Sequence, residues 1–273
     1  MGSATLAHGS DALRSGADEH RLIVSWQHPG TRAIEPIAVL SFDGGLYKFA
    51  YLDRAKAIDG FRPLLGFEDL DYSYESDGLF PLFAQRAMDP RRPDYGRYIS
   101  ELALDETSTP WEQIARSGGT REGDTLQLFP VPRFSDGAWK CFFLASGVRY
   151  LLKKSVMVDG VPRGSYEPEA LEKLLNDLEP GDVLQLEAEP DNEWSRFALL
   201  VTTEGGEPLG YVPQLLVEAL NVPHSDHKVH AKVEQVNPLE AGWHMRLLVE
   251  MTADLDASFE FFSEAKWPMA GAQ

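Results

Sequence analysis

Residues 187–213 read EAEPDNEWSRFALLVTTEGGEPLGYVP, and this stretch decides the fold that we expect for the second half of the chain. It opens with a Pro-Asp-Asn turn that carries an aromatic residue, Trp194. The apolar run after it ends in a Gly-Gly turn, which is typical of a strand that enters a hairpin. The closing Gly-Tyr-Val-Pro leads into QLLVEAL, where the proline predicts the start of a short helix. A turn, two strands and a helix are therefore expected within one short segment.

The neighbouring sequence adds further short strands. Strand-like patterns occur at 141–151, 182–189, 228–236 and 243–253. One helix interrupts them, because four leucines share a single helical face: Leu171, Leu174, Leu175 and Leu178. Several short strands around a small helix predict a small β-barrel.

The first half, 21–132, predicts a different mixture of elements. RLIVSW and PIAVLSF read as strands, and Asp-Gly-Gly then turns the chain into LYKFAYL, which indicates a hairpin. Two helices follow, the second opened by a capping box of Thr109 and Glu112 with Pro110 at the first helical position. We therefore predict an α+β protein of two domains, with mostly short antiparallel strands and a few helices. The turn-rich segment 131–138 separates the domains, and 1–20 and 252–273 are expected to be mobile tails.

Composition limits the possible functions. The chain has 43 acidic and 25 basic residues, a net charge of −18, which opposes loose attraction to phosphate. Its single cysteine, Cys141, permits no internal disulfide and fits a reducing, cytoplasmic setting. There is no apolar run long enough to cross a membrane and no apolar signal segment in residues 1–20, so we expect no membrane partner.

Three pieces of the second half occur in a specific order: Gly-Val-Arg-Tyr at 147–150, the Pro-Asp-Asn-Glu-Trp turn, and the Gly-rich hairpin that ends in Gly-Tyr-Val-Pro. In this order they resemble the HIRAN domain over roughly 139–251. The resemblance implies an OB-like barrel that binds single-stranded DNA, or DNA ends, by aromatic stacking. It also implies site positions, which are Arg149, Tyr150, Asn192 and Trp194.

Each of these positions has a physical role that the resemblance implies. Tyr150 and Trp194 can stack on bases, and Arg149 can meet phosphate. The amide of Asn192 can fix its own turn. Nearby Lys153 and Lys154 form a local basic pair, which is either a phosphate contact or a solvated edge.

Two positions depart from the family pattern. Ser195 stands where the family has an aspartate, and Pro213-Gln214 stands where DNA-end binders have a lysine. Recognition of a 3′ end is therefore left open, whereas base stacking is not affected by either change. Tyr211 is expected to pack.

Residues 21–132 resemble the small N-terminal subdomain of HipA-type kinases in the order of strands, helices and a Gly-Gly stop. The catalytic lobe of such kinases has no counterpart here, since the chain lacks its catalytic motifs. The resemblance implies a docking domain, and a HipA-like kinase encoded separately is one expected partner.

Other patterns predict less. GGTREGDT at 118–125 nearly fits a phosphate-binding loop, but Asp124 occupies the lysine position and would repel phosphate. His224, His227 and His230 are three residues apart in a segment that ends in a strand, which does not favour a zinc site. We therefore expect no catalytic residue, no metal ion and no cofactor.

Three functions follow from these observations. The first is a non-enzymatic DNA-binding protein with an N-terminal docking domain. The second is a regulatory protein that acts on a kinase-like partner without binding DNA. The third is an enzyme whose site the sequence does not show.

Overall fold

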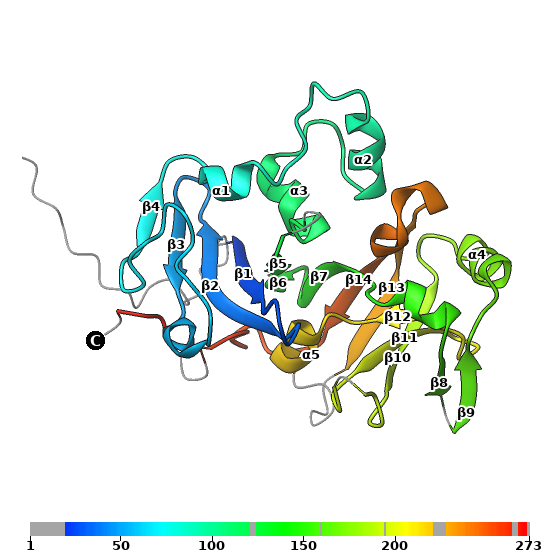
Figure 1. Cartoon of the computed structure of the whole chain (residues 1–273). Coiled ribbons are helices and arrows are strands. Elements are labelled where there is room, and N and C mark those ends of the chain that lie inside the picture. Colours follow the sequence, from blue (N-terminus) through cyan, green and yellow to red (C-terminus); the bar gives the residue numbers. More distant parts are fainter. Residues whose placement is uncertain are drawn as a thin grey trace, which may run out of the picture. The chain divides into compact units, whose positions relative to one another are not determined.

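A computed structural model describes most of the chain, namely residues 20–120, 124–158, 160–193, 195–220, 228–263 and 267–271. The chain divides into two compact units, and each is described by itself. Unit 1 comprises Met1–Ala87, Gly118–Val131 and Glu260–Gln273, and unit 2 comprises Met88–Ser117 and Pro132–Phe259. The fold is α+β and rich in strands, and the paired strands are antiparallel (Figure 1).

Unit 1 is built on a five-stranded sheet in the order β4-β3-β2-β1-β5 (Figure 1). Its hairpin between β2 and β3 forms as the sequence predicts, since Asp43 Oδ1 accepts hydrogen bonds from the backbone N–H groups of Gly45 and Leu46. The elements of this unit are β1 (His20–Gln27), β2 (Ile34–Phe42), β3 (Tyr47–Tyr51), η1 (Asp53–Ala57), β4 (Tyr74–Ser76), α1 (Pro81–Ala84) and β5 (Leu126–Pro130).

The core of unit 1 is aromatic and extends to the C-terminal segment. The Phe49 ring lies 4.1 Å from that of Phe67 and 5.7 Å from that of Phe83, measured between centroids. The segment expected as the mobile tail 252–273 behaves differently in its described part, because Met269 is buried and forms an antiparallel bridge with Leu52. The physical reason is that this segment buries apolar side chains, which a mobile tail would leave exposed to water.

Unit 2 is built on a seven-stranded sheet in the order β12-β11-β10-β13-β14-β7-β6, with a separate β8–β9 hairpin (Figure 1). The strands are β6 (Arg133–Ser135), β7 (Ala138–Leu144), β8 (Ser155–Val158), β9 (Val161–Gly164), β10 (Val183–Ala188), β11 (Leu199–Thr203), β12 (Pro208–Tyr211), β13 (Val229–Val236) and β14 (Leu247–Ala253). The helical elements are α2 (Tyr95–Glu101), α3 (Pro110–Ser117), η2 (Val148–Leu152), α4 (Pro168–Asn176), α5 (Gln214–Leu220), η4 (Leu239–Ala241) and η5 (Trp243–Met245).

Two helices of unit 2 follow the sequence pattern closely. The capping box of α3 forms, because Thr109 N–H donates to Glu112 Oε2 at 2.7 Å and Glu112 N–H donates back to Thr109 Oγ1 at 3.3 Å. In α4, Leu171 and Leu175 are the buried members of the predicted leucine stripe. Both α2 and α3 are grouped with unit 2, whereas the sequence pattern placed them in a domain spanning 21–132.

The expected closed barrel is not found among the described strands. The two edges of the sheet, β12 and β6, do not pair, and only one bridge joins Ser146, just after β7, to Tyr211 at the end of β12. The physical reason lies at Gly147, whose φ of 71° turns the chain from the strand direction into η2. The sheet is therefore open apart from that single bridge.

Candidate nucleic-acid interface

The bridge between Ser146 and Tyr211 brings two of the sequence motifs together. Ser146 N–H donates to Tyr211 O at 3.0 Å, and Tyr211 N–H donates to Ser146 O at 2.8 Å. A Cβ at Gly210 would lie 2.8 Å from Ser146 O, closer than backbone and side chain can approach, and Gly210 also has a φ of 149°. Only glycine fits here, so Gly210 holds the Gly-Tyr-Val-Pro segment against the chain that precedes Gly-Val-Arg-Tyr.

Gly147 begins the turn that carries Arg149 and Tyr150. It adopts a left-handed conformation, and a Cβ there would lie 2.9 Å from Tyr211 Cδ2. Tyr150 N–H donates to Gly147 O at 2.8 Å, which closes the first turn of η2. Arg149 is exposed and Tyr150 is half-buried. The motif glycine therefore seats Tyr211 below the turn and leaves Arg149 open to solvent.

Asn192 fixes the turn between β10 and β11. Its Oδ1 accepts a hydrogen bond from Ser195 N–H at 3.1 Å, and its Nδ2 donates to Glu189 Oε2 at 2.6 Å. The sequence pattern assigned this turn-holding geometry to Asn192. Trp194 lies outside the described residues.

Tyr211 joins this turn to β12. Its hydroxyl donates to Glu189 Oε2 at 2.9 Å, and its ring packs against a buried cluster of Leu151, Val156, Val158 and Leu200. Burial and the hydrogen bond to the Glu189 carboxylate raise the pKa of Tyr211 above its usual range. Tyr211 is therefore a packing residue, as the sequence predicts, and it also anchors Glu189.

Lys154 connects Tyr150 with the same turn. Its ammonium forms an ion pair with Glu193, and its Nζ lies 5.3 Å from the centroid of the Tyr150 ring. Hydrogen bonds to Glu193 and to Tyr150 raise the pKa of Lys154, so the group stays protonated. Arg149–Lys154 and the turn residues 189–193 are thus linked into one surface, although the Lys154 charge is balanced by Glu193.

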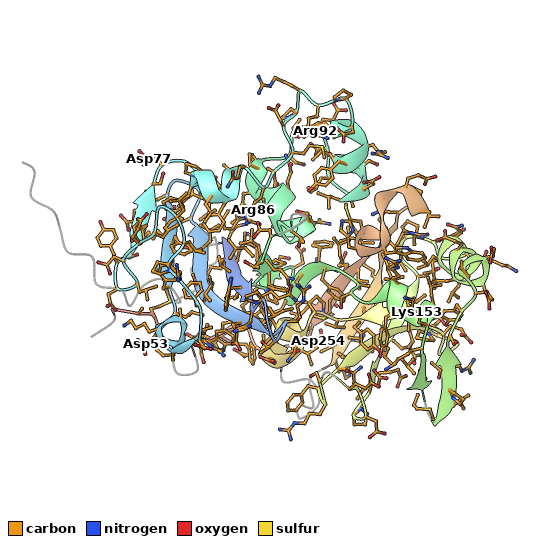
Figure 2. The ribbon with its side chains drawn as sticks, viewed as in Figure 1. Asp53, Asp77, Arg86, Arg92, Lys153 and Asp254 are labelled. Carbon is orange, nitrogen blue, oxygen red and sulfur yellow. The ribbon has the colours of Figure 1, made fainter. Side chains whose placement is uncertain are left out.

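Three other cations of this surface have no ion pair with any residue that the structure describes. Arg149, Lys153 and Arg196 are all exposed, and Lys153, which is labelled in Figure 2, lies between η2 and β8 in the chain. The Arg196 guanidinium stacks on its neighbour Phe197, with Cζ 4.6 Å from the ring centroid. Arg196 was not among the residues predicted from the sequence, although it lies only two residues after Trp194 in the chain.

Acidic residues share the surface with these bases. Glu189, Asp191 and Glu193 lie in the turn, and the nearby bases in the chain are Arg149, Lys153, Lys154 and Arg196, of which Lys154 pairs with Glu193. Four bases against three acids give little net charge. Any polyanion must therefore gain much of its binding energy from stacking, since charge alone contributes little here.

Metal binding and thiol chemistry find no support in the described part of the chain. It contains no group of three His, Cys, Asp or Glu residues that could hold a metal ion, and His224 and His227 lie outside it. Cys141 is buried, and that burial raises the pKa of its thiol far above the usual range, which makes it unreactive. None of the described helices has the length and apolar character needed to cross a membrane.

Comparison with known proteins adds one structural likeness. No family model and no curated protein matches the chain. The crystal structure of the HIRAN domain of human HLTF is similar over 44% of this chain and 81% of that chain, with 16% sequence identity and a TM-score of 0.28. The resemblance of residues 21–132 to HipA-type kinases receives no support from these comparisons.

Proposed function

We propose that the chain is a binding protein without enzymatic activity, and that its second unit binds single-stranded DNA or DNA ends. The observation that supports this most is the exposed surface around Arg149 and Tyr150, held against the 189–195 turn by the Ser146–Tyr211 bridge and the Lys154–Glu193 ion pair. The order of the three sequence motifs that form this surface is the second support.

Different side chains of this surface make different contacts with the bound strand in this proposal. The Tyr150 ring stacks on an unpaired base, a contact worth about 1–3 kcal/mol per base in such sites. Lys154 Nζ lies 5.3 Å from the centroid of that ring, and we place the base on the face away from Lys154. Arg149, Lys153 and Arg196 meet the phosphates, because their charges are not balanced by described residues. Trp194 is proposed as a second stacking residue from the sequence motif alone.

Binding of a fluorescent single strand tests the proposal. Anisotropy at low salt with an oligonucleotide of about 12 nucleotides covers the site sizes of related small barrels. Tyr150→Ala is expected to weaken binding about 10-fold or more, and to lower the melting temperature by less than the loss of a fully buried ring would, because the ring is half-buried.

The matched control is Tyr72→Ala, which removes a tyrosine that is 58% exposed in unit 1. It is expected to leave DNA affinity unchanged. Equal losses from both variants, or no binding at low salt, would sink the proposal.

A second function, docking of a protein partner by unit 1, is favoured by one observation. Leu65 is 86% exposed on a loop that also carries Glu68, Asp69 and Asp71. An apolar side chain among acids suits a partner with a basic rim, and a HipA-like kinase is the candidate that the sequence resemblance implies. Calorimetry of Leu65→Asp against purified kinase tests it, with loss of binding as the expected result.

A further inference from the structure

Glu189 is held in a fixed position by two neighbours that use the same oxygen. Tyr211 Oη donates to Oε2 at 2.9 Å, and Asn192 Nδ2 donates to Oε2 at 2.6 Å. Oε1 makes no hydrogen bond to any residue that the structure describes, and the side chain is only half-buried. Glu189 therefore presents one oriented acceptor atom to solvent.

A negative charge at this position opposes the proposed ligand, which is a polyanion. The two hydrogen bonds to Oε2 do not require the charge, because a glutamine oxygen accepts the same two donors. The charge thus weakens phosphate binding without being needed to hold the turn. A role for Oε1 that depends on a strong acceptor accounts for its presence.

The edges of nucleobases offer partners for such an acceptor. Cytosine and adenine carry an exocyclic amino group, and a carboxylate accepts a hydrogen bond from cytosine N4. Uracil and thymine carry a carbonyl oxygen at the corresponding position, which a carboxylate repels. A fixed carboxylate beside a stacked base therefore binds cytosine more tightly than uracil or thymine.

Two sets of contacts lead from Glu189 toward the Tyr150 ring. Tyr211, which anchors Glu189, packs its ring against the backbone of Gly147, whose carbonyl accepts the Tyr150 N–H. On the other side, Glu193 of the same turn pairs with Lys154, which lies over the Tyr150 ring. Both sets of contacts connect Glu189 to η2, which carries the Tyr150 ring.

We infer that Glu189 is a specificity-determining residue that selects bases with an exocyclic amino group, so that the site prefers cytosine to uracil. The inference rests on the proposed binding of single strands by this surface. Cytosine and uracil are the sharpest pair of probes because they have the same ring size and differ mainly at position 4.

The experiment compares the affinities of equally long oligo(dC) and oligo(dU) for the full chain. The wild-type protein is expected to bind oligo(dC) about 5-fold tighter or more, the low end of what one good base contact contributes. Glu189→Gln is expected to abolish or reverse the preference, because its oxygen keeps the hydrogen bonds from Tyr211 and Asn192 and its exposed amide nitrogen can donate to uracil O4 but cannot accept from cytosine N4.

Two further variants keep the test decisive. Tyr211→Phe removes one anchor of the carboxylate but keeps the packed ring, so it is expected to reduce the preference for oligo(dC). Glu240→Gln changes an exposed carboxylate on η4, outside this surface, and is expected to leave the preference intact.

The outcomes separate the inference from the proposal on which it rests. Loss of the preference in Glu189→Gln but not in Glu240→Gln supports the inference. Equal binding of both oligonucleotides by the wild-type protein overturns it, while the binding itself upholds the proposed function. Absence of binding to either oligonucleotide overturns both.

Discussion

Two arginines that follow aromatic segments show opposite uses of the same side chain. Arg86 in unit 1 has only 3% of its side chain exposed, donates to Gly119 O at 2.6 Å and forms an ion pair with Asp124. Arg149 in unit 2 is exposed and has no ion pair with a described residue. Figure 2 labels Arg86, and it also labels Lys153, which follows Arg149 by four residues in the chain. A buried, paired guanidinium holds the fold, whereas an open one is free for a ligand.

The partner of Arg86, Asp124, belongs to the glycine-rich segment of unit 1 that nearly fits the phosphate-loop pattern. Asp124, at the lysine position of that pattern, binds Arg86 through one oxygen and accepts from Leu126 N–H at 2.9 Å through the other. Gly118 and Gly119, which directly follow α3 in the chain, both have positive φ. Both carboxylate oxygens of Asp124 are therefore used in contacts within unit 1.

The largest predicted effect comes from Arg86→Ala. It leaves the partly buried Asp124 carboxylate without its partner and should lower the free energy of unfolding by about 3 kcal/mol or more. Urea unfolding measures this loss, and affinity for single strands, measured on folded protein, should not change. If Arg86→Ala lowered the free energy of unfolding no more than alanine at an exposed arginine such as Arg91 does, the contrast between Arg86 and Arg149 would be contradicted.

Gly210→Ala should have the next largest effect. The new Cβ meets the Ser146 carbonyl oxygen and the residue keeps a left-handed φ, so a destabilisation of about 2 kcal/mol or more is expected. Thermal unfolding and DNA anisotropy should both respond, because the bridge shapes the proposed site. Gly137→Ala is the control, since its φ of 85° is also positive but no atom lies within 4 Å of the new Cβ.

A third prediction concerns the buried hydroxyl of Tyr51 in unit 1. Burial raises the pKa of Tyr51 to about 12. The Tyr51 hydroxyl therefore keeps its proton in the folded state up to about pH 12, whereas in the unfolded chain it loses the proton near pH 10. The free energy of unfolding therefore falls as the pH rises from 10 to 12. At pH 11 the loss should be about 1 kcal/mol.

Comparison with Tyr51→Phe isolates that contribution. The variant loses the hydrogen bond to Phe67 O at every pH, but it should show a smaller decline in stability between pH 10 and 12 than the wild-type protein. Parallel declines for the two proteins would show that Tyr51 is not the titrating group.

The smallest effect is expected for Arg149→Gln. Removing one phosphate contact should make the plot of log affinity against log salt shallower by about 0.7, the value for one charge on a single strand. Lys154→Gln should change that slope less, because Glu193 balances the Lys154 charge. The reverse ranking would contradict the assignment of Arg149 as the free cation.

Local chemistry is what the sequence predicts well in this protein. The Asp43 hairpin, the Thr109 capping box and the turn held by Asn192 each depend on residues within a few positions of one another. Their hydrogen bonds are specified by side-chain type and spacing, so they can be found without knowledge of the fold.

Contacts between distant segments could not be predicted in the same way. The pairing of Met269 with Leu52, of Glu189 with Tyr211 and of Lys154 with Glu193 depends on how strands are arranged in space. The same limit explains the open sheet, since the end of strand pairing depends on the exact turn at Gly147. Alternation of apolar residues predicts that strands exist, but it does not specify their neighbours.

The most direct test of the central claim is amide chemical-shift mapping of the full chain during titration with oligo(dC). We predict that the amides of residues 147–154 and 189–193 shift together and saturate with one affinity. Saturating shifts confined to unit 1, or no shifts at all at low salt, would contradict the assignment of the Arg149–Tyr150 surface as the binding site.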